Sequence, residues 1–143
     1  MALNVDHLLR TAATLEQALL ALEKTPSRED ILFDLYRNAA IKSFELSLET
    51  AGKLLRKALK LYAGSPRSVD ALVFNDLLRH AGKHGLLDAD GVERWLAYRA
   101  NRNNTAHDYG EGFANDTLKL LPGYLADVRA LASKLQEVFD AAS

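Results

Sequence analysis

The sequence contains no cysteine, which excludes disulfide bonds and thiolate metal sites. No stretch approaches the roughly 20 apolar residues that a membrane-spanning helix requires, and the first residues form neither a basic segment nor a long apolar run. The chain is therefore expected to be cytoplasmic and to have no membrane partner. Its formal net charge is only −1, so any site for nucleic acid must be a local feature of the surface.

Proline and glycine are also scarce, with three prolines and eight glycines among 143 residues. They separate long segments that are dominated by Leu, Ala, Glu, Lys and Arg, which favour helices. Strand signals are absent, and the length suits one core. We expect a single all-α domain over residues 1–143, built as an antiparallel helical bundle of four to five helices.

The first two helices follow from apolar residues that repeat at spacings of three and four. The first is expected from about Asn4 or Asp6 to Lys24. The second is expected to be long, with Ser27 as its cap and its pattern continuing to Tyr62. A helix of about 35 residues spans around 50 Å, more than one small core covers, so part of it is expected to pack against another subunit. The bundle is accordingly expected to be a dimer.

Shorter helical segments follow. A third helix is expected around residues 70–84, with Gly85 as its left-handed stop and with inward-facing Leu72, Val73, Leu77 and Leu78. Asp88 is expected to cap a fourth helix that buries Val92, Trp95 and Leu96.

The end of the chain is expected to form one more helix. A turn is expected at residues 110–112, followed by a helix whose apolar residues run from Leu118 to Phe139. Pro122 is expected to interrupt this helix near its start.

The apolar face of the fourth helix ends after Ala100, and the polar run Arg102-Asn103-Asn104-Thr105-Ala106-His107-Asp108-Tyr109 follows. Arg102 is a permanent cation whose planar donors suit phosphate, and His107 can give or take a proton near neutral pH. If this run is catalytic on RNA, His107 moves a proton to or from an attacking or leaving oxygen. Arg102 then stabilises the charge on the phosphoryl oxygens, Asn103 orients His107 or holds a phosphate, and no metal is required.

A plainer interpretation of the same run is an exposed helix end, where Arg102 and His107 stabilise the helix dipole. In a straight helix these two residues lie about 140° apart around the axis. To act on one phosphate, they require either a helix that ends or distorts between them or two subunits that meet across a cleft.

Two other groups of polar residues allow more than one interpretation. His80 and His84 have the spacing of a two-histidine metal site, but the glutamate of the zinc protease motif is missing, so a solvated helix end is favoured. On the long second helix, a solvated face is favoured over a polar patch in a dimer cleft for Lys42, Glu45, Glu49 and Lys53. The C-terminal half of that helix is basic, which suits its dipole, a phosphate backbone or an acidic partner, through Lys53, Arg56, Lys57 and Lys60.

Together, the helical layout and the pattern Arg-x4-His-x-Tyr at Arg102, His107 and Tyr109 resemble the HEPN superfamily, and more narrowly its HepT-like branch of nucleotidyltransferase-associated proteins. The resemblance covers nearly the whole chain. The long second helix also looks like that branch, through Arg37, Ile41, Phe44, Glu45 and Glu49.

The resemblance implies a dimeric HEPN-like domain whose paired motifs meet in a cleft. It implies a metal-independent endoribonuclease toxin without a cofactor, in which Arg102 and His107 are the catalytic pair and Asn103 is a supporting residue. The implied antitoxin is a minimal nucleotidyltransferase that transfers AMP from ATP to Tyr109, adding bulk and negative charge where RNA must enter. Supporting or RNA-binding roles are expected for Arg99, Asn104 and Asp108.

Two alternatives remain open at the level of sequence. Family members of the same shape are also described as substrate-binding partners of a nucleotidyltransferase without nuclease activity of their own. In that case the chain is the non-catalytic, nucleotide-binding half of a two-component transferase. The third possibility is a structural helical dimer without a site.

Overall fold

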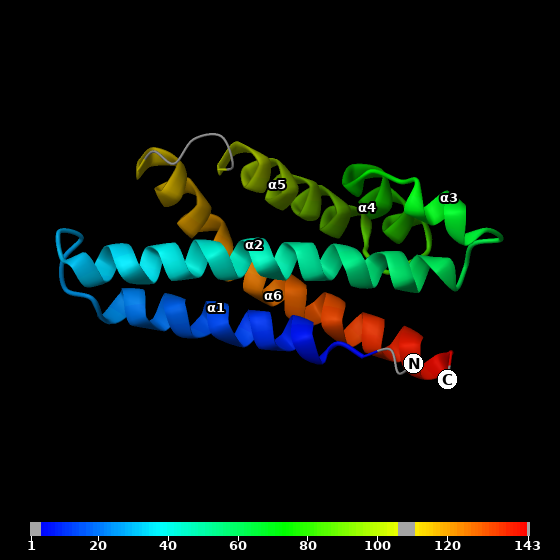
Figure 1. Ribbon diagram of the computed structural model, residues 1–143, viewed down its shortest axis with the longest axis horizontal. Helices are drawn as coiled ribbons and strands as arrows, with labels where there is room; N and C mark the ends of the chain where they lie inside the picture. The colour runs from blue at the N-terminus through cyan, green and yellow to red at the C-terminus, as the bar shows by residue number, and fades with distance from the viewer. Residues whose placement is uncertain (1–3, 106–110, 143) are drawn as a thin grey trace.

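The computed structural model describes the backbone of residues 4–105 and 111–142, and the side chains of residues 4–102 and 115–142 (Figure 1). These residues form no strand, which confirms the all-α prediction. Six helices are present instead of the expected four to five: α1 (Asp6–Lys24), α2 (Ile31–Lys60), α3 (Pro66–Asp70), α4 (Phe74–Lys83), α5 (Ala89–Thr105) and α6 (Glu111–Ala141). Within this part of the chain, no helix combines the length and the apolar character needed to cross a bilayer.

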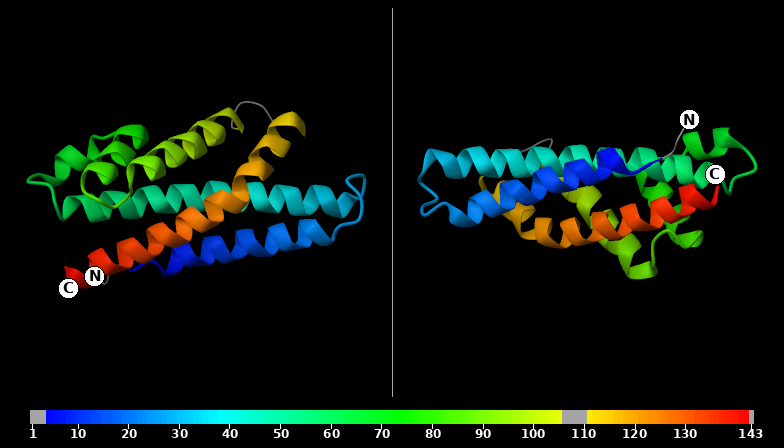
Figure 2. Two further views of the ribbon diagram at one scale, coloured as in Figure 1. Left: turned by 180° about the vertical axis from the view of Figure 1, so that it is seen from behind. Right: turned by 90° about the horizontal axis from the view of Figure 1, so that it is seen from below.

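The long helix α2 is the centre of the arrangement. α1 runs beside it in the opposite direction, and α6 packs against both α1 and α2 (Figure 2). α3, α4 and α5 lie on the side of α2 that faces away from α1 (Figure 1). The last turn of α5, in which the polar run begins, therefore lies on the side of α2 opposite α1.

The first helix has the predicted limits, whereas the second begins later than predicted. Its cap is Asp30, whose side chain accepts a hydrogen bond of 2.9 Å from the backbone N–H of Leu32. Ser27, the predicted cap, accepts a hydrogen bond from the backbone of Glu29 within the turn before α2. Both residue types are good caps, and the turn over 27–30 decides which of them stands at the helix end.

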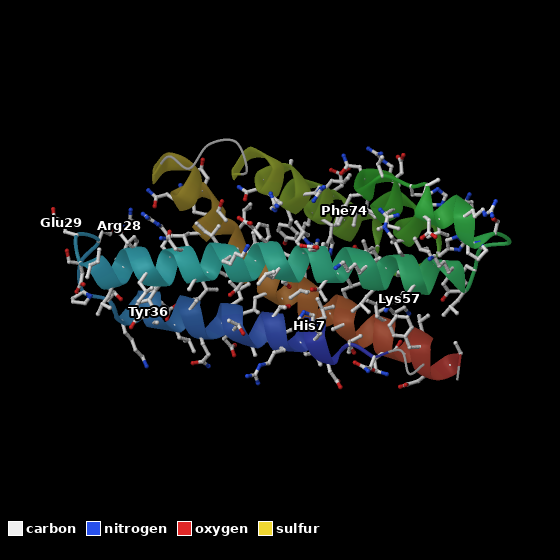
Figure 3. All side chains as sticks on the ribbon, viewed as in Figure 1. His7, Arg28, Glu29, Tyr36, Lys57 and Phe74 are labelled. Atoms are coloured by element: carbon white, nitrogen blue, oxygen red, sulfur yellow. The ribbon has the colours of Figure 1, made fainter. Side chains whose placement is uncertain are left out.

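The helix predicted over residues 70–84 begins only at Phe74, as α4. A short helix that was not predicted, α3, precedes it, and residues 71–73 separate the two. The break places Val73 at the cap of α4 with 64% of its surface exposed, so its predicted inward position is wrong. Leu77 and Leu78 are fully buried as expected, and Gly85 has the left-handed φ of 78° that ends the segment. The break also gives Phe74 the first position of α4, facing α2 (Figure 3).

The last two helices are longer than the sequence pattern indicates. α6 already begins at Glu111, so the turn predicted over 110–112 is wrong for Glu111 and Gly112. Pro122 lies inside α6 without ending it. Its ring is on the exposed side, and burial of the neighbouring Leu121 and Tyr124 outweighs the one backbone hydrogen bond that proline cannot make. The predicted cap of α5 is confirmed, since Asp88 accepts a 2.6 Å hydrogen bond from the backbone of Gly91.

An aromatic cluster joins α2, α5 and α6 in the core. Trp95 is buried as predicted, and its ring stands edge-on to Tyr98 and Tyr124. Val92 and Leu96, also predicted to be buried, are only half-buried. Tyr124 is fully buried and donates a 2.7 Å hydrogen bond to the hydroxyl of Ser47 on α2. Burial raises the pKa of Tyr124, so its hydroxyl stays protonated far above neutral pH.

The first third of α2 extends beyond this core. No residue of α2 before Ala40 is buried, and three large apolar residues there are exposed: Ile31, Leu32 and Leu35. This agrees with the expectation that α2 is longer than one core can cover.

Candidate functional site

The polar run begins in the last turn of α5, and only its first part is described. Arg102 belongs to α5 with its side chain one-third exposed. Asn103 and Asn104 have helical backbones, and their side chains lie outside the described residues. His107, Asp108 and Tyr109 lie entirely outside them.

Arg102 faces α2, where it meets Glu45. The Nε atom of Arg102 lies 3.8 Å from Oε2 of Glu45, and the carboxylate is only 21% exposed. A solvated face was the favoured interpretation of Glu45, and that interpretation is wrong because α5 packs over it. The contact is an ion pair rather than a hydrogen bond, since the distance exceeds the hydrogen-bonding range. A carboxylate from α2 therefore holds the guanidinium group on the groove side of α5.

A polar groove of about 330 Å³ opens beside this ion pair, between α2, α4 and α5. We call it the α2–α5 groove. Four cations face two carboxylates in its lining, so its local charge is positive although the chain carries a net charge of −1. The lining residues are Glu45, Leu48, Glu49, Gly52, Lys53, Arg56, Phe74, Arg99 and Arg102. The predicted supporting residue Arg99 therefore shares a groove with Arg102.

Arg99 is held in the groove by an aromatic ring. Its guanidinium carbon lies 4.7 Å from the ring centroid of Phe74, a cation–π contact. The ring of Phe74 also packs closely against Gly52 on α2, where an added Cβ would lie 2.6 Å from Cε2 of Phe74. Sequence analysis missed Phe74 and Gly52, although a glycine inside a strong helical pattern is a signal of close packing.

The two helices that flank the polar run are also fastened to each other. Thr117 of α6 is fully buried and donates a 2.9 Å hydrogen bond to Oδ1 of Asn101, the residue before Arg102. Further along, Asp127 accepts hydrogen bonds from the hydroxyl of Tyr98 and from Nε and Nη2 of Arg94. Burial and the bond to Asp127 raise the pKa of Tyr98. These contacts fix the crossing of α5 and α6 and thereby the position of Arg102.

The described residues contain no group of three or more His, Asp or Glu side chains arranged to hold a metal ion. His84 stacks on the ring of Tyr62, with ring centroids 5.1 Å apart. The chemistry that the groove offers is anion recognition: a guanidinium group at its end and three further cations along its walls suit phosphate groups.

Comparison with known proteins identifies relatives over nearly the whole chain. Residues 10–137 match the family described as nucleotidyltransferase substrate binding protein like. A Haemophilus influenzae protein named "Probable ribonuclease HepT" is 27% identical over 138 residues, which cover 94% of this chain and 93% of that protein.

Two solved structures share the fold. One, from Haemophilus influenzae, is described as having the fold of a substrate binding domain of a nucleotidyltransferase. It superposes with a TM-score of 0.80 at 28% identity and covers 92% of this chain and 98% of its own. The other is a crystal structure of a Thermus thermophilus protein with a TM-score of 0.73 at 24% identity, covering 90% of this chain and 98% of its own.

Proposed function

This chain belongs to the nucleotidyltransferase substrate binding protein like family, within its HepT-like group, and from that membership we propose that it is a metal-independent endoribonuclease toxin. The relative named as a ribonuclease supports this activity. The observation that carries the proposal is the position of Arg102, in the last turn of α5 at the end of a locally positive groove. A permanent cation in such a groove suits the phosphodiester of RNA.

The proposed reaction uses the 2′-hydroxyl of RNA as the nucleophile on the neighbouring phosphorus. His107 exchanges a proton with the attacking or leaving oxygen, and the guanidinium group of Arg102 stabilises the charge that gathers on the phosphoryl oxygens. Asn103 orients His107 or holds a phosphoryl oxygen. Glu45 keeps the Arg102 side chain in the groove before the substrate arrives.

The proposed active form is a homodimer in which the two motifs meet. The first third of α2 supports this form, because it projects beyond the core with exposed Ile31, Leu32 and Leu35. A second subunit also resolves the angular problem of the motif, since Arg102 of one copy and His107 of the other can then face one phosphate.

The proposed regulator is a minimal nucleotidyltransferase that transfers AMP to Tyr109. A nucleotide two residues from His107 would add negative charge and bulk beside the scissile phosphate, opposing RNA entry by repulsion and by steric exclusion. The family description supports a nucleotidyltransferase partner in general terms.

A second candidate function is favoured by the solved Haemophilus structure, which is described as a substrate binding domain. In this alternative the α2–α5 groove presents a nucleotide or its acceptor to the nucleotidyltransferase, and the chain cleaves nothing. Both functions predict a partner enzyme, so a partner cannot distinguish them. They differ in whether the chain arrests growth when it is expressed alone.

The deciding experiment expresses the chain alone, with His107→Ala, and together with its cognate nucleotidyltransferase. Growth and intact-protein mass are recorded for each culture. We expect arrest by the wild type, recovery with His107→Ala, and recovery with the partner accompanied by a mass gain of one or more AMP units at Tyr109. His7→Ala is the matched control, since His7 is an exposed histidine of α1, on the other side of α2 (Figure 3).

The opposite result is equally informative. Unimpaired growth with the wild-type chain, no cleavage of total RNA by the purified protein, and no mass change would overturn the toxin and favour the binding subunit. Cleavage assays in the presence of a chelator test the metal independence separately.

A further inference from the structure

We propose that the α2–α5 groove binds a phosphate of the RNA strand next to the scissile one, so that the substrate is a single strand longer than a dinucleotide. The inference rests on the proposed ribonuclease function and extends it from the reacting phosphate to the flanking chain. The groove leads away from Arg102 along α2, and apart from Arg102 its lining residues lie outside the motif.

The groove carries an excess of positive charge. The chain as a whole is slightly acidic, yet the lining of this groove holds Lys53, Arg56, Arg99 and Arg102 against Glu45 and Glu49. Each carboxylate has a cationic neighbour: Oε1 of Glu49 lies 3.5 Å from the Lys53 amine, and Glu45 faces Arg102. After these two pairings, the lining retains the positive charges of Arg56 and Arg99. This excess of positive charge attracts the negatively charged phosphodiester.

The side chains of Arg56 and Arg99 are already held in place before any ligand binds. Arg56 donates a 3.0 Å hydrogen bond from Nη1 to the backbone carbonyl of Val69, which fixes its guanidinium group at the groove wall. Arg99 lies over the ring of Phe74, and that ring packs closely against Gly52 on α2. Because these side chains are already ordered, a phosphate binds them at a smaller cost in conformational entropy than it would at mobile surface lysines.

The groove adjoins the proposed reaction centre, because Arg102 is one of its lining residues. Arg99 and Arg102 are three residues apart on α5 and so share one face of the helix. One end of the groove is thus the residue proposed to act on the scissile phosphate, and the other end is formed by Lys53 and Arg56. A strand held at Arg102 continues most directly along these cations.

The test measures RNA binding in a His107→Ala background, so that substrate persists. A fluorescein-labelled single strand of about ten nucleotides is titrated at several salt concentrations, beside a labelled dinucleotide. Lys53→Glu and Arg99→Gln are expected to weaken binding of the long strand by about tenfold and to reduce the slope of log affinity against log salt by about one. Binding of the dinucleotide should change less than twofold.

The matched control is Arg10→Glu, which reverses an exposed charge on α1. The helix α1 lies on the opposite side of α2 from α4 and α5 (Figure 1). Arg10→Glu should leave the affinity for both RNAs within about twofold of the parent. Lys53 is 71% exposed, so its replacement preserves the fold, and circular dichroism verifies this for every variant.

The outcomes separate the inference from the function on which it rests. Unchanged affinity of Lys53→Glu and Arg99→Gln for the long strand would overturn the groove inference alone. Absence of both RNA binding and RNA cleavage by the parent protein would overturn the proposed function as well. Loss of the nucleotidyltransferase partner by these variants, with RNA affinity retained, would instead make the groove a protein interface and overturn the inference.

Discussion

Thr117 on α6 and Asn101 on α5 are joined by a hydrogen bond of 2.9 Å, and the polar run lies in the chain between them. Thr117 is fully buried and Asn101 is half-buried, so this bond is partly shielded from water. It ties the residue next to Arg102 to a fixed point of the bundle core.

Thr117→Val removes the donor while keeping the side-chain shape. We expect a loss of about 1 kcal/mol in the free energy of unfolding, because the half-buried Asn101 loses this hydrogen bond. Turnover of RNA should fall more than RNA affinity, since Arg102 is then less well positioned. Urea unfolding and steady-state cleavage measure the two effects, and Thr117→Ser should restore both. Full turnover in the valine variant would contradict the positioning role of this bond.

Gly52→Ala tests the close packing of the Phe74 ring against α2. Alanine favours a helix interior over glycine by about 1 kcal/mol, but its Cβ would lie 2.6 Å from the Phe74 ring. We expect the overlap to dominate, lowering the melting temperature and weakening binding of long RNA as Arg99 loses its support. Gly64→Ala is the control, because nothing lies within 4 Å of an added Cβ there. The decrease in melting temperature caused by Gly52→Ala should vanish in a Phe74→Leu background. A decrease that persists there would show that the overlap with Phe74 is not its cause.

Glu45→Gln separates the two effects of this carboxylate on Arg102. Removing its negative charge should lower KM for RNA, because one repulsion within the groove disappears. Losing the ion pair should also lower kcat, because Arg102 is no longer held by a charge 3.8 Å away. Steady-state kinetics resolve the two changes, with Glu23→Gln on α1 as the matched control. Unaltered kcat and KM would remove Glu45 from the site.

Tyr124→Phe should alter the response of stability to alkaline pH. Burial raises the pKa of Tyr124 in the folded protein, so the unfolded chain releases this proton first as pH rises above about 10. Stability from this group is complete below that pH and is lost above it. The phenylalanine variant should therefore lose less stability between neutral and strongly alkaline pH than the wild type. Urea midpoints across that range measure the difference, and parallel curves would contradict it.

Phenylalanine should also lower stability at neutral pH, by about 1 kcal/mol, because Ser47 loses its partner in the core. Combining Tyr124→Phe with Ser47→Ala should recover part of this loss.

The fold was predictable wherever one apolar stripe continued without interruption. α1 has its predicted limits because Leu8, Ala12 and Leu15 fill one face, and all three are buried. The break between α3 and α4 escaped prediction because Leu72 and Val73 continue the apolar pattern across it. Only the packing of Phe74 onto α2 distinguishes the two arrangements.

Part of the candidate site was predictable from the sequence, on the helix that carries the motif and, for Lys53 and Arg56, on the basic half of the second helix. Arg99 and Arg102 stand near the polar run in sequence, and their shared face follows from helical spacing. Glu45 and Gly52 lie on α2, and their approach to α5 depends on how the helices cross. Helical spacing along one segment contains no information on that crossing, so the pairing of Glu45 with Arg102 and the packing at Gly52 required the structure.

The charge distribution described above also bears on how the protein behaves among cellular nucleic acids. Four of the 18 Lys and Arg residues but only two of the 19 Asp and Glu residues line the groove, so the rest of the chain is net acidic. At physiological ionic strength charges act over about 8 Å, so we expect RNA to bind most favourably at the groove, where cations exceed carboxylates. We therefore expect little unspecific binding to bulk RNA, which would leave the protein available to its partner.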